Sequence, residues 1–307
     1  MAPGTGTPAT DWRLMSIAQR EREYSPSSCI GGNYMPFIEA YQRLSQSAMA
    51  PCEALGATWS TRHYGPQEAN QLALCMPAIQ GQPKGNSPAL LVFIHGGYWQ
   101  ELSAKDSLFP ALGCIQHGVA YAALDYPLAP AASLPDIVAQ CRLAISWLFL
   151  NAAVLGFDAH RVVVAGSSAG AHLAAMVAWP GWQPTDQGHA FAVRAAVLVS
   201  GIYELGPLVG TTINIALRMD VHTAQEQSPA LLPLAGFPQT LVCWGAIETE
   251  EFKRQSRHFT QALKDAGTSC DVFEVAQRNH FDVILDLVSV DAPLGRKTLA
   301  LLGCDSA

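Results

Sequence analysis

The chain has 307 residues, of which half are apolar and only 14% are charged, so it can build a large buried core. This composition excludes an intrinsically disordered chain, which requires low hydrophobicity and high net charge. The formal net charge is −7, from 18 basic and 25 acidic residues, and Lys and Arg form no cluster. Nucleic acid or an anionic membrane surface is therefore not expected as a partner, because both require concentrated positive charge.

The sequence shows no pattern typical of secretion or of membrane insertion. Its most apolar stretch, residues 143–157, is shorter than the roughly 20 residues that a bilayer requires and contains Asn151. Residues 1–13 have neither a basic start nor an apolar run. The eight cysteines include no C-x-x-C pair, so we expect thiols in a reducing compartment. These observations predict a soluble, cytoplasmic protein.

Secondary-structure patterns divide the chain into an N-terminal extension and a longer alternating part. Residues 1–50 are partly helical in pattern, and we expect them to pack on or near the active site. The alternating stretches 57–64 and 72–76 predict two strands that are joined by a turn. Continuous apolar runs, typical of strands buried on both faces, predict six more strands at 90–94, 119–124, 161–165, 195–200, 240–244 and 270–275.

Helical patterns lie between these strands, most clearly over residues 134–150. Strands that alternate with helices predict an α/β fold, with an eight-stranded, mostly parallel sheet covered by helices on both faces. The stretch 203–237 is longer than an ordinary crossover, and we expect it to form a small cap at the carboxyl ends of the strands, where ligands bind. Residues 51–307 are thus predicted to form one catalytic domain with a cap insertion.

The most informative motif is Gly166-Ser167-Ser168-Ala169-Gly170, which follows a predicted buried strand and precedes an apolar helix. In this setting G-x-S-x-G forms a sharp turn that presents the central serine above the sheet as a nucleophile. The register of the motif selects Ser168 and not Ser167. The alternative is an ordinary Gly/Ser turn before a helix.

A serine hydroxyl needs a base that takes its proton, and an acid orients that base. Glu248 directly follows the strand at 240–244, and His280 follows the last strand, so both are expected at the sheet edge that carries Ser168. Among the other acids, Glu250 and Glu251 are interpreted as solvated residues in the first turn of a helix. We therefore predict a triad of Ser168, Glu248 and His280.

The segment His95-Gly96-Gly97-Tyr98-Trp99 follows the strand at 90–94. Acyl transfer places negative charge on an oxygen, which backbone N–H groups must already face. We expect Gly96, Gly97 and Ala169 to supply this oxyanion hole, with His95 organising the loop by hydrogen bonding. The aromatic side chains of Tyr98, Trp99 and Tyr203 are predicted to contact the substrate.

With these motifs, the chain resembles the α/β-hydrolase superfamily over roughly residues 55–300, and within it the kynurenine formamidase (arylformamidase) family. The resemblance is carried by His-Gly-Gly-Tyr-Trp with the following Gln100-Glu101, by the serine motif, by residues 201–205 and by His280-Phe281-Asp282. It implies a cytosolic hydrolase that removes a formyl group from an arylamine without a metal or an organic cofactor. The family usually has an aspartate where Glu248 stands, which moves the carboxylate by one methylene.

These residues predict a serine hydrolase that cleaves an arylformamide such as N-formylkynurenine through an acyl-enzyme. A carboxylesterase acting on small or aromatic esters would use the same residues, as would an amide hydrolase acting on another nitrogenous aromatic compound. A non-catalytic binding protein with this fold is a further alternative. The expected partner is a small, aromatic substrate, and the sequence leaves open whether the chain forms a homodimer.

Overall fold

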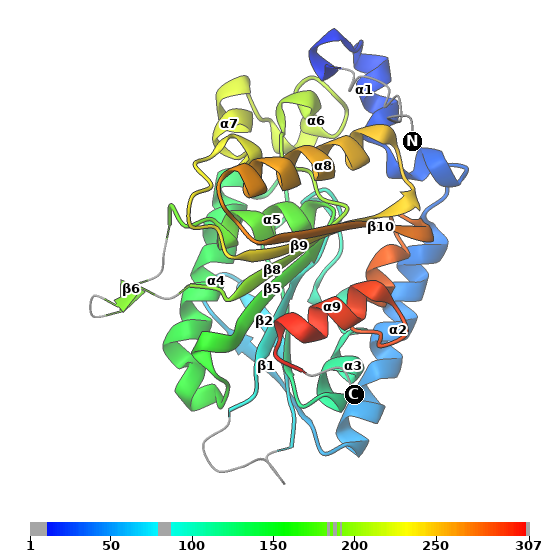
Figure 1. Ribbon diagram of the computed structural model, residues 1–307. Helices are drawn as coiled ribbons and strands as arrows, with labels where there is room; N and C mark the ends of the chain where they lie inside the picture. Colours follow the sequence, from blue (N-terminus) through cyan, green and yellow to red (C-terminus); the bar gives the residue numbers. More distant parts are fainter. Residues whose placement is uncertain (1–10, 79–86, 183–184, 187–188, 191, 305–307) are drawn as a thin grey trace, which may run out of the picture.

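A computed structural model describes residues 11–78, 87–182, 185–186, 189–190 and 192–304. Its centre is an eight-stranded sheet with the strand order β1-β2-β4-β3-β5-β8-β9-β10 (Figure 1). The strands are β1 (Thr58–His63), β2 (Gln71–Met76), β3 (Leu90–Ile94), β4 (Ala120–Leu124), β5 (Val162–Ser167), β8 (Ala195–Val199), β9 (Gln239–Ile247) and β10 (Cys270–Asn279). The pairs β1–β2 and β2–β4 are antiparallel and the other pairs are parallel, which confirms the predicted mixed sheet.

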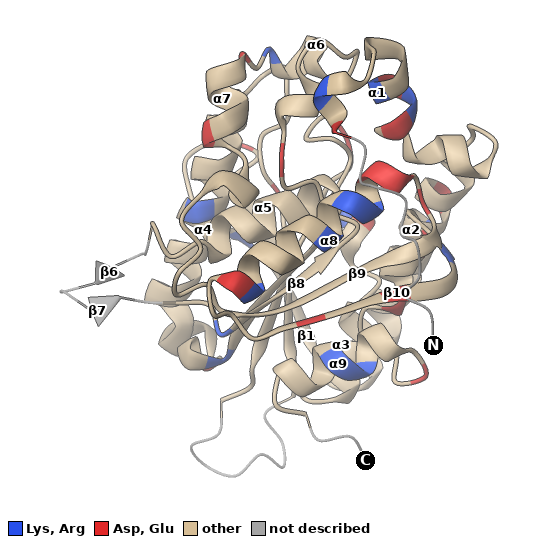
Figure 2. Ribbon diagram, turned by 45° about the horizontal axis from the view of Figure 1, so that its top comes forward, with Lys and Arg blue, Asp and Glu red and all other residues tan. Residues whose placement is uncertain are grey.

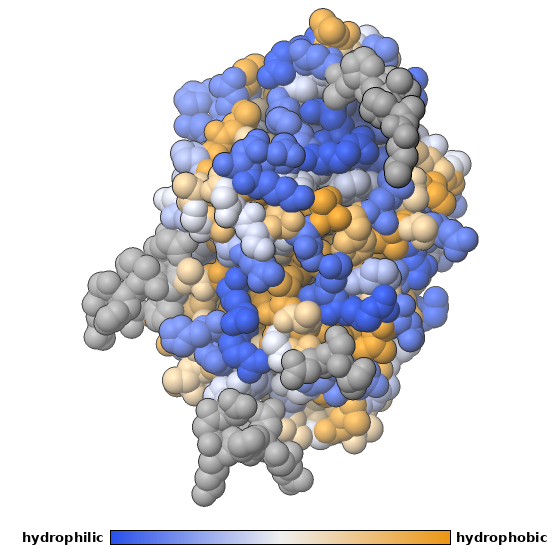
Figure 3. Space-filling model, viewed as in Figure 1, coloured by the Kyte–Doolittle hydropathy of each residue, from blue (hydrophilic) through white to orange (hydrophobic). Residues whose placement is uncertain are grey.

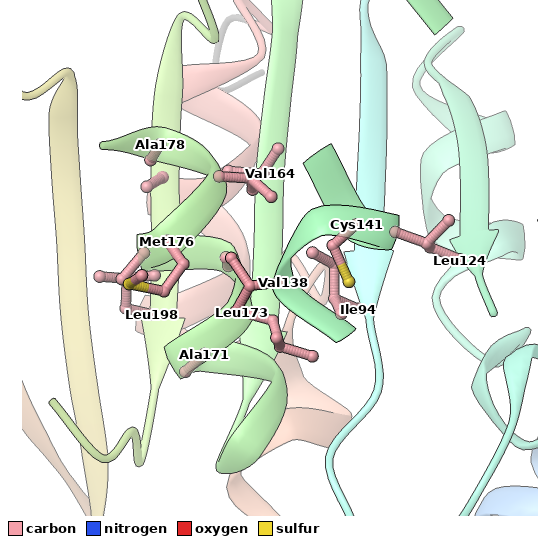
Figure 4. Packing of buried hydrophobic residues seen from close by; sticks show 14 of the residues in the cluster. Ile94, Leu124, Val138, Cys141, Val164, Ala171, Leu173, Met176, Ala178 and Leu198 are labelled. Atoms are coloured by element: carbon pink, nitrogen blue, oxygen red, sulfur yellow. The ribbon is translucent and has the colours of Figure 1, made fainter. Parts of the chain in front are cut away.

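The continuous apolar runs form strands because helices cover both faces of the sheet. Every residue of β3, β4 and β8 is buried. Along β3, Leu90, Val92 and Ile94 point into one core cluster, whereas Leu91 and Phe93 point into the other. Figure 4 shows part of the first cluster, in which side chains of α4 and α5 meet those of the strands.

Helices pack on both faces of the sheet, and each contributes side chains to one of the two core clusters. Side chains of α4 (Leu134–Leu155), α5 (Ala169–Ala178) and α8 (Glu250–Asp265) belong to the first core cluster. Those of α2 (Met35–Ala54), α3 (Ala111–Gln116) and α9 (Pro293–Leu301) are found in or against the second. The chain therefore forms three layers, with the sheet in the middle (Figure 1).

Helix α4 is longer than the predicted stretch 134–150, and by length and composition it could cross a membrane. In the structure its inner face packs against the sheet and α5, with Ile137, Cys141 and Ile145 buried. A helix with this pattern is equally typical of the core of a globular protein.

On the face drawn in Figure 3, apolar patches alternate with hydrophilic residues. Figure 2 likewise shows acidic and basic residues interspersed over the described part of the chain.

Shorter elements gather at the end of the molecule where α1, α6 and α7 lie (Figure 1). From the N-terminal segment come η1 (Trp12–Leu14), α1 (Ile17–Glu23) and η2 (Pro26–Ile30). The predicted cap contains η5 (Gly206–Leu208), α6 (Asn214–Leu217), α7 (Val221–Glu226) and η6 (Pro229–Leu231). Outside the main sheet lies a hairpin of β6 (Thr185–Asp186) and β7 (His189–Ala190). Because α2 runs through residue 50, the predicted boundary between residues 50 and 51 falls within one helix.

Candidate active site

Ser168 lies in the sharp turn between β5 and α5. Its φ of 57° and ψ of −123° are a strained conformation for a residue other than glycine. The turn is possible because its glycines lack side chains: a Cβ on Gly166 would lie 2.1 Å from the carbonyl oxygen of Gly170, and a Cβ on Gly170 would lie 2.0 Å from that of Ile94. The sequence motif therefore adopts the strand–turn–helix geometry of a serine nucleophile in an α/β sheet.

The acid and the histidine of the predicted triad form a buried pair. His280 Nδ1 lies 2.9 Å from Glu248 Oε2. The other carboxylate oxygen, Oε1, accepts hydrogen bonds of 2.6 Å from the Ser200 hydroxyl and from the Gly245 backbone N–H. The Glu248 side chain has no solvent exposure. The pair fixes Nδ1 of His280 as the protonated nitrogen, which leaves Nε2 to act as the base.

The glutamate, despite its extra methylene, is held by hydrogen bonds at both carboxylate oxygens. Ser200 follows β8 and Gly245 lies in β9, so two neighbouring strands position the carboxylate. Ser168 and His280 line the same cavity. The structure thus brings all three predicted catalytic residues together at one edge of the sheet.

The predicted oxyanion-hole residues lie around the nucleophile. β3 and β5 pair in parallel up to Ile94↔Gly166, which places the segment after β3 beside the serine turn. A Cβ on Gly96 would lie 2.8 Å from the carbonyl oxygen of Ser167, so only glycine allows this approach. Ala169 is the first residue of α5, where the backbone N–H has no partner within the helix.

Gly97 continues the same segment with a φ of +90°, and a Cβ there would lie 2.4 Å from the carbonyl oxygen of Glu101. The preceding His95 is buried, and its ring stacks on Tyr126 with centroids 4.2 Å apart. His95 Nδ1 lies 3.0 Å from the Gly96 carbonyl oxygen, as expected for a residue that organises this loop. Burial lowers the pKa of His95 to about 4, so the ring is neutral at physiological pH.

Of the three residues predicted to contact the substrate, one lines the cavity and two do not. Tyr98 lines it, and its hydroxyl donates a hydrogen bond to the Tyr24 carbonyl. Trp99 and Tyr203 are not among the described residues that line the cavity, and both side chains are buried in the core. Trp99 has a φ of +60° and packs edge-on against His172.

Tyr203, at the start of the cap, stacks on Phe259 of α8 with ring centroids 4.3 Å apart.

The interpretation of Glu251 as a solvated residue is also corrected. Its carboxylate is buried, accepts a 2.7 Å hydrogen bond from the Tyr24 hydroxyl and forms a bidentate ion pair with Arg254. Glu250, by contrast, is exposed as expected. A buried carboxylate requires such partners, and the partner from residue 24 could not be seen in the local pattern.

The cavity above Ser168 has a volume of about 330 Å³. The N-terminal segment builds a large part of its wall, as expected for an extension that packs near the active site. Its contribution comprises Glu21, Tyr24, Ser25, Pro26, Ser27, Tyr34, Ile38 and Tyr41. The catalytic part and the cap add aromatic and aliphatic side chains, among them Phe93, Phe109, Ile213, Phe281 and Ile284. Such a mostly apolar wall with a few polar groups is typical of a small-molecule site.

The charged residues around the cavity are acidic. Glu21, Glu101 and Asp106 line it, and no Lys or Arg is found among its described lining residues. Both carboxylate oxygens of Glu21 already accept hydrogen bonds, one from the backbone N–H and one from the hydroxyl of Thr212. Burial raises the pKa of Glu101, and the hydrogen bond from Tyr34 partly offsets this effect. The cavity is therefore suited to a neutral or positively charged group.

Together, the strained serine, the buried acid–histidine pair and the glycine segment beside them define a serine hydrolase with an α/β-hydrolase fold. Comparison with known proteins agrees. The BD-FAE family matches residues 78–227. A kynurenine formamidase from Danio rerio is 30% identical, and the match covers 96% of this chain and 99% of that protein. Esterase LipQ from Mycobacterium tuberculosis is 26% identical over 60% of this chain and 48% of its own length.

A solved structure from Silicibacter sp. TM1040, described as that of a candidate thioesterase, superposes with a TM-score of 0.74 and 26% identity. The superposition covers 94% of this chain and 98% of the other. Esterase LipW from Mycobacterium marinum, 22% identical over 88% of this chain and 87% of its own, shares the fold with a TM-score of 0.65. The chain belongs to the α/β-hydrolase superfamily, as a distant homologue of kynurenine formamidases and esterases.

Proposed function

We propose that this serine hydrolase removes the formyl group from an arylformamide of the N-formylkynurenine type. The observation that carries the proposal is the extent of the formamidase match. It covers 96% of the chain, and thus reaches into the N-terminal segment that walls the cavity, whereas the match to esterase LipQ covers 60%. The aromatic lining supports a flat substrate, and the Glu101 carboxylate at the cavity supports one with an ammonium group.

The reaction begins with attack of the serine on the formyl carbon. His280 Nε2 takes the hydroxyl proton of Ser168 as the Oγ–C bond forms, while Glu248 stabilises the imidazolium through Nδ1. The carbonyl oxygen becomes an oxyanion, which backbone N–H groups of Gly96, Gly97 and Ala169 stabilise. The tetrahedral intermediate collapses, and His280 gives the proton to the departing arylamine.

The second half of the reaction regenerates the enzyme. Water enters the space left by the arylamine, and His280 removes one of its protons as the oxygen attacks the formyl ester on Ser168. The second intermediate releases formate and returns the proton to the serine oxygen. A formyl group is the smallest acyl group, so it needs little room between Ser168 and the glycine segment, where Gly96 lies in close contact with the serine turn.

A carboxylesterase is the second candidate, since the BD-FAE family matches residues 78–227, which include Ser168, and esterase LipQ is 26% identical over 60% of the chain. Comparison of kcat/KM for N-formylkynurenine, p-nitrophenyl acetate and p-nitrophenyl butyrate separates the two. Our proposal predicts at least about a tenfold preference for the formamide, equivalent to roughly 1.4 kcal/mol of transition-state stabilisation. Turnover of the esters without turnover of the formamide would contradict the proposal and favour the carboxylesterase.

A further inference from the structure

His280 lies in the turn that directly follows the last strand of the sheet. It follows β10, which is an edge strand of the described sheet and pairs with β9. The pairing is regular up to Val275↔Gly245 and resumes at Asn279↔Ile247, so the strand bulges just before the catalytic histidine. Within the bulge, Gln277 has a φ of +62°. An edge strand with a bulge does not by itself fix the position of the side chain that follows it.

The N-terminal segment contacts the residue after the catalytic histidine. The ring of Phe281 stacks on Tyr34, with centroids 5.6 Å apart and an interplanar angle of 9°, and on Phe37, with centroids 5.5 Å apart. The Tyr41 hydroxyl donates a hydrogen bond to the carbonyl oxygen of Phe281. Residues 34, 37 and 41 have the spacing of one helix face, so α2 and its N-terminal cap hold both the side chain and the backbone of Phe281.

The position of His280 matters at a scale of about 1 Å. Glu248 fixes one end of the ring through Nδ1, and Phe252 packs edge-on against it at 4.5 Å between centroids. The backbone on either side of the ring is held locally, because Asp282 accepts a hydrogen bond from the Asn279 N–H and Asn279 accepts one from the Phe281 N–H. A base must stay within hydrogen-bonding distance of the serine oxygen, so the position of this whole turn matters as well. A displacement of about 1 Å can reduce an enzymatic rate by roughly 100-fold.

We propose that Tyr41 is a positioning residue for catalysis: with Tyr34 and Phe37 it holds Phe281, and thereby sets His280 relative to Ser168. The N-terminal segment then contributes to the rate of acyl transfer as well as to the shape of the cavity. This inference rests on the triad mechanism proposed above, but not on the formamide as substrate.

The test is Tyr41→Phe, which removes the hydroxyl and keeps the ring that stacks on Phe109. Tyr64→Phe is the matched control, because it also removes a buried hydroxyl that donates to a backbone carbonyl, that of Asp125 at 2.7 Å. Three quantities are measured: kcat and KM for p-nitrophenyl acetate, the rate constant for labelling of Ser168 by a fluorophosphonate, and the melting temperature.

We expect Tyr41→Phe to lower kcat and the labelling rate constant together by about 10-fold or more, with KM changed less than about twofold. Tyr64→Phe should lower the melting temperature and leave both rate constants within about twofold of the parent. Equal rate constants in Tyr41→Phe and the parent would overturn the proposal. An equal fall in both variants would do the same, because it would reflect general destabilisation.

Phe37→Leu provides a second route if Tyr41→Phe does not fold. Phe37 contacts Phe281 and is not among the residues that line the cavity, so its loss cannot act through direct contact with the substrate. A several-fold lower labelling rate with unchanged KM supports the positioning role, and an unchanged labelling rate contradicts it. A parent protein that fluorophosphonate does not label would instead overturn the triad mechanism, and this result is distinct from equal labelling of parent and variant.

Discussion

Replacement of Glu248 by glutamine tests how the acid acts on the histidine. The substitution keeps the shape of the side chain and removes its charge. In the parent, both oxygens accept hydrogen bonds: Oε1 from Ser200 and Gly245, and Oε2 from His280. Glutamine has one oxygen and one NH₂ group. Because the Gly245 N–H can only donate, the amide oxygen must face Gly245 and Ser200, and the NH₂ group must then face His280.

This orientation reverses the tautomer of His280. Nδ1 of His280 would accept a hydrogen bond from the amide, so the proton of the neutral ring would lie on Nε2, which could no longer take the proton of Ser168. We expect kcat to fall by about 10³- to 10⁴-fold, which corresponds to roughly 4–5.5 kcal/mol of transition-state stabilisation. The assay is kcat for N-formylkynurenine and for p-nitrophenyl acetate, with the melting temperature as the measure of folding.

Ser200→Ala is the companion variant, because it removes one of the two donors to Oε1 and leaves the charge of Glu248 intact. We expect it to lower kcat by no more than about 10-fold, or roughly 1.4 kcal/mol. A folded Glu248→Gln variant with kcat within about 10-fold of the parent would refute the argument. It would mean that another group orients His280.

Two further predictions concern charge. Glu101→Gln should raise KM for N-formylkynurenine by about 3- to 10-fold and leave KM for neutral p-nitrophenyl acetate within twofold, because it removes a carboxylate at the cavity. Equal changes for both substrates would contradict a role in binding an ammonium group. Burial lowers the pKa of His172 to about 4, from an ordinary value of 6.5. Between these two values the histidine is protonated in the unfolded chain but not in the folded one, so the free energy of unfolding falls as pH drops from 6.5 toward 4. At pH 5 this loss of unfolding free energy is about 2 kcal/mol. Urea unfolding at pH 7 and pH 5 should therefore show a correspondingly smaller loss for His172→Gln than for the parent. An unchanged loss would contradict the lowered pKa of His172.

The elements of the sheet could be predicted from the sequence because their signals are local. Strands buried on both faces require continuous apolar runs, and β3, β4 and β8 are such runs. The serine turn is equally local, since Gly166 and Gly170 are required by contacts within or next to the turn. The acid and the histidine followed from chain order and from their positions after strands.

The walls of the cavity could not be predicted in the same way, because they form between segments far apart in the sequence. The Tyr41 hydroxyl and its acceptor in Phe281 are separated by 240 positions. The aromatic residues at 34, 37 and 41 repeat with helical spacing, and this signal could have drawn attention to the N-terminal segment. The direction of the Trp99 side chain depends on a positive φ in a glycine-rich turn, which local sequence does not specify.

The central claim is that this protein hydrolyses an acyl substrate through covalent attack by Ser168. The most direct measurement combines intact-protein mass spectrometry after fluorophosphonate treatment with turnover of N-formylkynurenine by the parent and by Ser168→Ala. The parent should gain the mass of one label and turn over the formamide. Ser168→Ala should gain no label, retain its melting temperature to within a few degrees, and lose more than about 10⁴-fold in kcat. Label or turnover that persists in folded Ser168→Ala would contradict the account.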